Sequence, residues 1–209
     1  MKKIVIADPH PITRRGIKEL LQNSESFKVI GEVSNGNELI KVLAKKKPAV
    51  LVLELDMPGV IGFKIFNEVL KALPKIKIVV FSSYPEEIYA AHSIKTGAKG
   101  YIHKTASANQ FLKALKIVIS GNTYLSKETR DTSKKSLTTA SIKNRYSQLS
   151  TREIEVLDLL VAGKRNKDIA ALLGINEKTV STYKSRLLKK LNIKNLAELI
   201  SHSRALPTL

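Results

Sequence analysis

The sequence predicts a (βα)5 domain with a doubly wound parallel sheet, followed by a smaller all-α domain of four helices. Two observations support this α/β plus all-α organisation. In residues 1–121, short apolar runs alternate with stretches of helical periodicity, whereas in residues 148–209 only helical periodicity is present. Apolar strands that alternate with helices indicate βαβ units, in which helices cover both faces of a parallel sheet. A chain of 209 residues is long enough for two domains of this kind.

Each strand of the first domain is expected to be followed by a helix. The strands are expected at Lys3–Ala7, Lys28–Val33, Ala49–Leu55, Lys77–Phe81 and Gly100–His103. The helices are expected at Ile12–Asn23, Gly36–Lys46, Gly62–Ala72, Glu86–Thr96 and Ala106–Ser120. Right-handed crossovers bring the carboxyl ends of parallel strands to one edge of the sheet, where the sites of open α/β sheets lie.

Residues 122–147 differ in composition from the segments on either side. Ser, Thr and Lys dominate there and apolar residues are isolated, which is typical of an interdomain linker. The whole chain has 36 basic and 18 acidic residues, for a net charge of +18. Such a charge favours a polyanionic partner, although a generally lysine-rich composition would also produce it.

Several classes of protein are disfavoured by composition. The chain has no cysteine, which excludes disulfides and thiolate metal sites. The start, Met1-Lys2-Lys3, leads into only four apolar residues, so a signal peptide is not expected. No apolar run approaches the ~20 residues that a membrane helix needs. We therefore expect a cytoplasmic protein without a membrane partner.

The second domain shows clear helix boundaries. Ser150 and Glu153 fit a capping box at the start of its first helix, and Gly163 fits the residue that ends it. Further helices are expected at Asn166–Leu173, from Asn176 as N-cap to about Leu191, and at Asn195–Arg204. The short turn at Gly174, between the second and third of these helices, is a helix-turn-helix signature.

The third of these helices has two distinct faces. Val180, Tyr183, Leu187 and Leu191 recur at helical spacing and are expected to face the core. Hydroxyl groups and cations share the opposite face: Lys178, Ser181, Thr182, Lys184, Ser185 and Lys189. This mixture suits a helix in the DNA major groove, because hydroxyl groups can contact base edges while lysines contact phosphates.

Together these residues resemble the LuxR-type DNA-binding domain over about sixty positions. The matching residues are Asn166, Ile169, Ala170, Leu173, Ile175, Thr179, Val180, Lys190 and Leu191. The resemblance implies that Ser181, Thr182 and Ser185 approach bases and that Thr179, Lys184 and neighbouring lysines contact phosphates. It also implies a homodimer on paired half-sites of double-stranded promoter DNA. Pairing would use the last helix through Leu196, Leu199 and Ile200, unless these residues are buried within their own domain.

Polar residues follow four of the predicted strands. Asp8, Pro9 and His10 come after the first strand, Glu54 ends the third, Ser82 follows the fourth, and His103 leads to Lys104 after the fifth. In a parallel sheet these strand ends converge on one edge, so a shared pocket is expected there.

With the Met57-Pro58-Gly59 turn and the Gly97–Tyr101 segment, these residues resemble the receiver domain of NarL/FixJ-type response regulators throughout residues 1–121. The resemblance implies that Asp8 is an acidic pocket residue, that Ser82 and Lys104 contact a phosphoryl group, and that Tyr101 turns inward on activation. A sensor kinase is implied as a further partner.

Two positions depart from that family pattern. The family has an aspartate phosphoacceptor where this chain has Glu54, and a second acidic residue where it has Pro9. Mg²⁺ needs hard oxygen ligands in near-octahedral geometry, so the loss of a carboxylate at Pro9 predicts weak or absent Mg²⁺ binding. A longer acceptor shifts the reacting oxygen by over ~1 Å, which can slow a reaction by about 10²-fold.

Three readings of Glu54 remain open. Its carboxylate could replace the phosphoryl group through charge-assisted hydrogen bonds, form an inert ion pair with Lys104, or still be phosphorylated. Asp56 is a less favoured acceptor, because its side chain is expected to point outward from the loop. His10 and His103 are expected to be ordinary hydrogen-bonded histidines and not metal ligands.

The favoured function is a DNA-binding transcriptional regulator that works without phosphorylation. The alternatives are a conventionally phosphorylated regulator and a protein that sequesters other regulators by dimerisation. A Mg²⁺-dependent phosphohydrolase also places aspartates at strand ends. It would need a second acid near Asp8, which the chain lacks, so we do not expect an enzyme.

Overall fold

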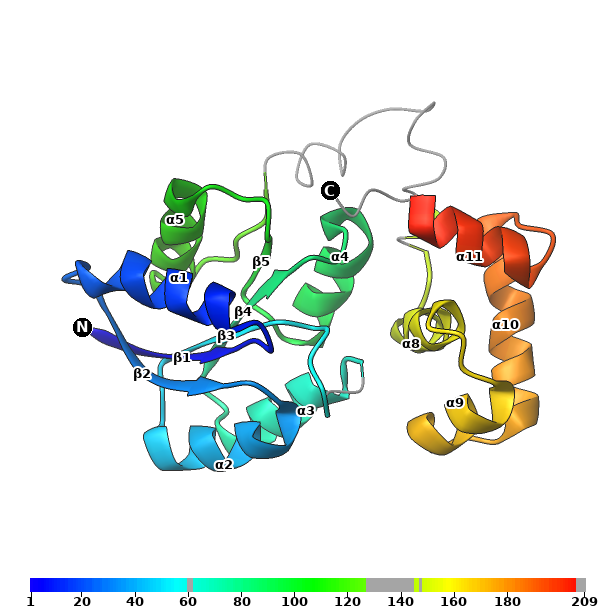
Figure 1. Ribbon diagram of the computed structural model, residues 1–209, viewed down its shortest axis with the longest axis horizontal. Coiled ribbons are helices and arrows are strands. Elements are labelled where there is room, and N and C mark those ends of the chain that lie inside the picture. The colour runs from blue at the N-terminus through cyan, green and yellow to red at the C-terminus, as the bar shows by residue number, and fades with distance from the viewer. Residues whose placement is uncertain (60–61, 127–144, 147, 206–209) are drawn as a thin grey trace.

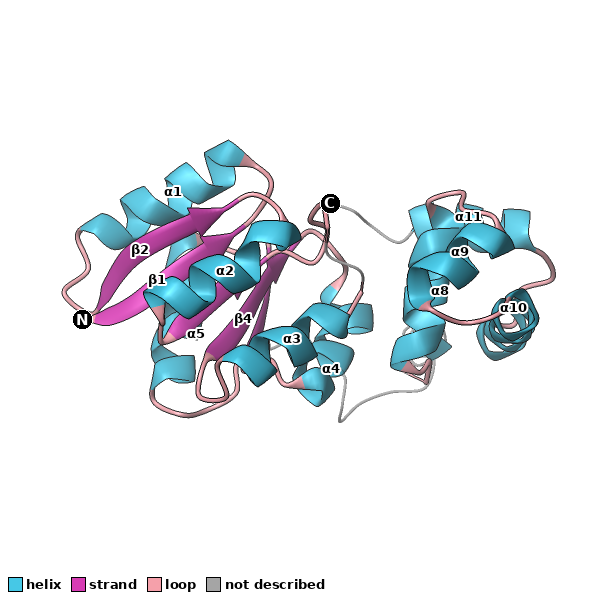
Figure 2. Cartoon of the chain, turned by 90° about the horizontal axis from the view of Figure 1, so that it is seen from below, coloured by secondary structure: helices cyan, strands magenta, loops and turns pink. Residues whose placement is uncertain are grey.

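The first domain contains a five-stranded parallel sheet in the order β2-β1-β3-β4-β5 (Figure 1), which is drawn in magenta in Figure 2. The computed structural model describes residues 1–59, 62–126, 145–146 and 148–205, with the main chain alone for 202–205. The strands are β1 (Lys2–Ala7), β2 (Phe27–Val33), β3 (Val50–Leu53), β4 (Lys77–Ser82) and β5 (Gly100–His103). This sheet confirms the predicted fold class and brings all five carboxyl ends to one edge.

Helices cover both faces of the sheet, as the alternating pattern predicts. One face is covered by α1 (Pro11–Gln22) and α5 (Ala108–Ile119), the other by α2 (Gly36–Lys46), α3 (Lys64–Ala72) and α4 (Glu86–Thr96). Along each strand, successive side chains point to opposite faces and so contribute to different apolar clusters. Both faces of the central strand β3 are therefore buried.

The strand β3 is shorter than the sequence suggests. The apolar run predicts a strand as far as Leu55, but β3 ends at Leu53. The reason lies in Glu54, whose carboxylate accepts hydrogen bonds from the N–H groups of Leu55 and Asp56. Because a side chain and not a neighbouring strand satisfies these groups, the chain leaves the sheet here.

The segment after α5 returns to the sheet. Tyr124 forms a parallel bridge with Gly100 and is almost fully buried. The N–H of Ser126 donates to Oε1 of Glu86 on α4 at 2.8 Å. The isolated apolar residues of this segment predict a linker, yet Tyr124 extends the core of the first domain. The remainder of the predicted linker, 127–144 and 147, lies outside the described residues.

The second domain has four helices in its described part: α8 (Thr151–Val161), α9 (Asn166–Leu173), α10 (Glu177–Leu191) and α11 (Leu196–Ala205). The capping box of Ser150 and Glu153 is confirmed, as are the left-handed Gly174 and the N-cap Asn176. Glu153 also forms a 2.7 Å ion pair with Lys190, which ties α8 to α10. Thus one capping residue also connects two helices of the domain.

Two residues before the predicted start of this domain also belong to it. Tyr146 is buried in the apolar cluster, and Arg145 donates to the main-chain oxygen of Leu191 at 3.0 Å. Arginine is well suited to this position, because the carbonyl groups at a helix C-terminus lack partners within the helix.

The two domains lie side by side and share one apolar cluster (Figure 1). In Figure 1, α8 is the helix of the second domain nearest α4, while α10 lies on the side away from the sheet. Among the described residues, no helix is both long and apolar enough to cross a membrane.

Candidate functional site

Four strand ends form a pocket at the carboxyl edge of the sheet. Asp8 follows β1, Glu54 follows β3, Ser82 ends β4, and Lys104 follows β5. Asp8, Glu54 and Ser82 are 2%, 2% and 0% exposed, so the polar groups are removed from bulk water. Buried polar groups of this kind need partners close by, and the pocket supplies them.

Glu54 is held by contacts to both of its carboxylate oxygens. Oε1 accepts hydrogen bonds from the Ser82 hydroxyl, from the N–H of Leu55 at 2.7 Å and from the N–H of Asp56 at 3.1 Å. Oε2 forms an ion pair with Lys104 at 2.7 Å. These charge-assisted bonds fix the position of the carboxylate.

Lys104 connects the two acidic residues of the pocket. Its ammonium group lies 2.7 Å from Oδ2 of Asp8 and 2.7 Å from Oε2 of Glu54. Burial lowers the pKa of Lys104, but hydrogen bonds and charges from Asp8 and Glu54 outweigh it and hold this pKa above its ordinary value. Lys104 is therefore a fixed positive charge at neutral pH.

The remaining strand-edge residues complete the pocket without adding a carboxylate. Asp8 Oδ1 accepts from the His10 N–H at 2.7 Å and contacts the His10 ring at 3.0 Å. Pro9 offers only its main-chain oxygen, which accepts from Arg14 at 3.1 Å. His103 bonds to Thr105, and the side chain of Asp56 is exposed. Both histidines are thus hydrogen-bonded, as expected.

Tyr101 points into the domain and is fully buried. Its hydroxyl donates to the main-chain oxygen of Tyr84 at 2.7 Å, and the Tyr84 N–H donates to Ser82 Oγ at 3.2 Å. Burial raises the pKa of Tyr101 well above its ordinary value, so the hydroxyl stays a donor. The loop that carries Tyr84 is therefore attached to the residues around Glu54.

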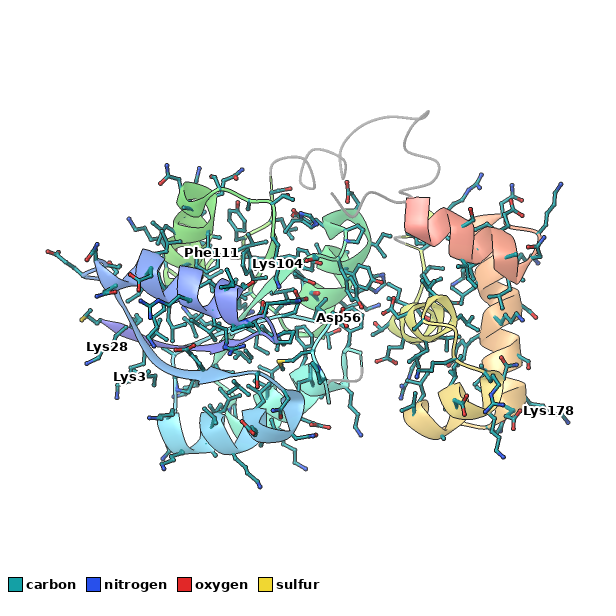
Figure 3. All side chains as sticks on the ribbon, viewed as in Figure 1. Lys3, Lys28, Asp56, Lys104, Phe111 and Lys178 are labelled. Atoms are coloured by element: carbon teal, nitrogen blue, oxygen red, sulfur yellow. The ribbon has the colours of Figure 1, made fainter. Side chains whose placement is uncertain are left out.

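The helix α10 presents the predicted DNA-facing residues to solvent. Lys178, Ser181, Thr182, Ser185 and Lys189 are exposed, while Lys184 and Thr179 are half-buried. In Figure 3, Lys178 lies at the end of the second domain that is far from the sheet. On the opposite side, Val180 and Leu187 are fully buried, so the two faces have the polarity that the sequence predicts.

Local hydrogen bonds set the starting positions of these hydroxyl groups. Asn166 on α9 donates to Ser181 Oγ at 3.2 Å, which joins the two helices of the motif. The Thr179 hydroxyl donates to the capping oxygen of Asn176, and Thr182 donates to the main-chain oxygen of Lys178. Each of these three hydroxyl oxygens keeps acceptor capacity for a ligand.

The last helix contributes less free surface than the sequence suggests. Leu199 is fully buried within its own domain, while Leu196 and Ile200 are half-buried. A leucine in the core cannot also contact a partner, so the predicted pairing surface is reduced to Leu196 and Ile200. Their role in dimerisation stays a prediction.

Sequence reasoning did not identify the contacts between the domains. Glu155 and Asp158 on α8 point toward the first domain, where they meet the Phe63 main chain and the Tyr89 side chain. Three residues apart on a helix, they share one face. That face also carries Leu159 and Ala162, which line the same pocket as the two carboxylates, so the local sequence pattern gives no clear sign that it contacts another domain.

The sheet, the strand-edge pocket and the attached helix-turn-helix domain together define a receiver joined to a DNA-binding output domain. A profile for the response regulator receiver domain matches residues 4–116, and one for bacterial regulatory proteins of the luxR family matches residues 147–203. The chain therefore belongs to the response regulators with a LuxR-type output domain, and it is a DNA-binding transcriptional regulator of that kind.

Similar proteins span both domains. The virulence factors putative positive transcription regulator BvgA of Bordetella pertussis is 35% identical over 198 residues, which cover 95% of this chain and 94% of BvgA. The oxygen regulatory protein NreC of Staphylococcus haemolyticus is 34% identical over 208 residues, or 96% of each chain. RcsB of Salmonella enterica serovar Typhimurium, bound to promoter rprA with the phosphomimetic BeF3−, matches at a TM-score of 0.84 with 25% identity. That match covers 99% of this chain and all of RcsB.

Proposed function

We propose that this response regulator binds promoter DNA in a receiver state that Glu54 maintains without phosphorylation. The observation that carries the proposal is the set of contacts around the Glu54 carboxylate. One oxygen accepts from Ser82 and two N–H groups, and the other pairs with Lys104. A hydroxyl, main-chain N–H groups and an ammonium are also the groups that bind a phosphoryl oxygen well.

The pocket is poorly suited to Mg²⁺, which phosphorylation of a receiver requires. Mg²⁺ needs oxygen ligands with near-ideal octahedral geometry. The oxygens of Asp8 contact His10 and Lys104. Those of Glu54 contact Ser82, two main-chain N–H groups and Lys104. Pro9 has no side-chain oxygen. Because the Lys104 ammonium already lies between the two carboxylates, the donor set does not fit the metal.

The proposed output is sequence-specific DNA binding by a homodimer. The exposed hydroxyl groups and lysines of α10 suit base and phosphate contacts, respectively. Helix-turn-helix proteins read paired half-sites as dimers, and this supports the same arrangement here. The similarity to RcsB in a promoter complex formed with BeF3− extends over both domains and is consistent with a DNA-competent arrangement.

The proposal is tested by attempted phosphorylation. We expect no stoichiometric phosphoryl adduct by mass spectrometry when the protein is incubated with acetyl phosphate and Mg²⁺. BeF3− is likewise expected to leave promoter affinity unchanged. Restoring both acidic positions with Pro9→Asp and Glu54→Asp should create a detectable adduct, because it returns a metal ligand and shortens the acceptor.

A variant with Asp56→Asn serves as the control for an unintended acceptor. Asp56 is exposed and carries the nearest other carboxylate on the same loop. A stoichiometric adduct on the unaltered protein, or a clear gain in affinity with BeF3−, would favour the conventionally phosphorylated alternative. Loss of the adduct in Asp56→Asn would then identify that residue as the acceptor. If the protein shows no specific promoter binding at moderate salt, the sequestering alternative is favoured.

A further inference from the structure

Two hydrogen bonds join α8 of the DNA-binding domain to the receiver. The N–H of Phe63, just before α3, donates to Oε1 of Glu155 at 3.1 Å, and both groups are buried. The hydroxyl of Tyr89 on α4 donates to Oδ1 of Asp158. Figure 3 shows Asp56 on the side of the receiver that faces the second domain. The contact thus lies close to the loop that follows Glu54.

Only glycine fits at position 62, because the Glu155 side chain lies close to its main chain. A Cβ atom added at Gly62 would lie 2.5 Å from Cγ of Glu155 and 2.7 Å from Oε1. Such distances force the Glu155 side chain to move, so a larger residue at this position would displace the bond to Phe63. The docked arrangement therefore requires a glycine at position 62 of the receiver.

Packing between the two domains is incomplete at this contact. A cavity of about 190 Å³ lies between them, lined by both receiver and α8–α9 side chains. Its walls combine apolar residues with three carboxylates, those of Asp56, Glu155 and Asp158. A cavity in an interface forfeits contact energy, so the hydrogen bonds carry more of the specificity of docking.

The docked position leaves the DNA-facing surface open. It is α8 that contacts the receiver, while the exposed lysines and hydroxyl groups of α10 lie on the opposite side of the domain. Docking therefore orients the DNA-binding domain without covering it. On the receiver side, Tyr89 stacks on Tyr84 with ring centroids 4.6 Å apart, and Tyr84 is held by Tyr101 and Ser82.

We propose that Tyr89–Asp158 and Phe63–Glu155 form a latch that docks the DNA-binding domain on α4 with its recognition helix outward, and that acid strengthens this latch. The latch does not depend on whether Glu54 replaces a phosphoryl group. In this latch, Asp158 orients the DNA-binding domain and does not contact DNA.

The pH dependence follows from the surroundings of Asp158. Burial raises the pKa of Asp158 to about 7, and the nearby charges of Glu155 and Asp56 add to the rise, while the Tyr89 hydrogen bond opposes it. An aspartate with a higher pKa in the docked state binds a proton more tightly there. Docking is therefore strongest at low pH, weakens as pH rises toward 7, and changes little above it.

Other titratable and charged groups lie near the latch. Tyr84 and Tyr89 keep their protons, because burial raises both pKa values above the physiological range. Arg152 forms an ion pair with Glu155 at 2.8 Å. On α4, burial and then Lys95 lower the pKa of His92, so this ring gains a proton only in acid. His92 could add its own pH dependence, and the variants below separate the two.

The test measures docking directly in the full chain. Because the protein has no cysteine, Lys71→Cys and Lys164→Cys provide two unique positions for a donor and an acceptor dye, both on exposed side chains. We expect energy transfer typical of the docked state at pH 5.5 and reduced transfer at pH 8. The docking constant is expected to fall by about 10- to 30-fold over this range, given a pKa of about 7.

Three variants in this labelled background identify the groups responsible. Tyr89→Phe should lower transfer at pH 5.5, because Asp158 loses its partner. Asp158→Asn should keep the domains docked and remove most of the pH dependence, because the amide resembles the protonated acid in charge. Gly62→Ala should lower transfer at both pH values, because the displaced Glu155 side chain loses its bond to Phe63. Gly121→Ala, also at positive φ but with nothing near the added Cβ, is the matched control and should leave docking unchanged.

The latch is overturned if transfer in the parent is the same at pH 5.5 and 8. It is equally overturned if Asp158→Asn keeps the full pH dependence, since His92 or another group would then be responsible. Unchanged transfer in Gly62→Ala would also contradict it. None of these outcomes bears on phosphorylation, so the proposed function can fail or stand separately.

Discussion

Replacing Lys178, Lys184 and Lys189 with alanine is expected to weaken promoter binding on the order of 10²-fold at physiological salt. Each lysine that neutralises a phosphate releases counterions and contributes about 0.9 to the slope of log K against log salt concentration. The variant should therefore show a smaller slope, by up to about 3 for each protomer. A titration of labelled promoter DNA at several salt concentrations measures both quantities.

A variant with Lys41, Lys45 and Lys75 replaced by alanine is the matched control. These lysines are exposed on the receiver, and their removal subtracts the same charge from the +18 of the chain. Its slope should stay near that of the parent protein, because bulk charge has little effect without contact. Equal losses in both variants would mean that α10 is not the DNA-facing surface.

Lys104→Met is expected to lower the free energy of unfolding of the receiver by about 3 kcal/mol. The substitution leaves Asp8 and Glu54, both 2% exposed, without the ammonium that lies 2.7 Å from each. Buried carboxylates without a counter-charge carry a large desolvation penalty, which the methionine side chain cannot offset. Urea denaturation followed by circular dichroism gives the change.

The pair of Lys18 and Glu32 provides the comparison. Its two charged groups also lie 2.7 Å apart, but the lysine side chain is 51% exposed. Lys18→Met should cost less than about 1 kcal/mol, because water screens an exposed pair. The account of the pocket would be contradicted if the two substitutions had similar effects.

Periodicity and end signals were sufficient to predict most of the fold. Gly36–Lys46, Glu86–Thr96 and Asn166–Leu173 have the predicted bounds, because each has a clear amphipathic pattern or a clear capping or turn residue. Local sequence patterns did not predict the structure of segments that depend on contacts with residues far away in the sequence. Tyr124 lies in a stretch without periodicity, yet it pairs with Gly100 on β5 and is buried in the core.

The pocket could be predicted in outline but not in detail. The strand-end positions of Asp8, Glu54, Ser82 and Lys104 follow from the parallel topology, so their convergence could be expected. The two N–H donors to Glu54 could not, because they depend on the turn of the main chain after β3. Contacts of α8 with the receiver depend on how two separate domains meet, which local pattern does not encode.

The central claim is that the charge of Glu54 maintains the DNA-binding state. Glu54→Gln tests it most directly, because the amide keeps the shape and one acceptor oxygen but removes the charge that pairs with Lys104. Promoter affinity and dimerisation of this variant should fall by roughly tenfold, the effect of losing about 1.4 kcal/mol, while circular dichroism shows an intact fold. Affinity and dimerisation equal to those of the unaltered protein would contradict the claim and leave Glu54 as an inert ion pair.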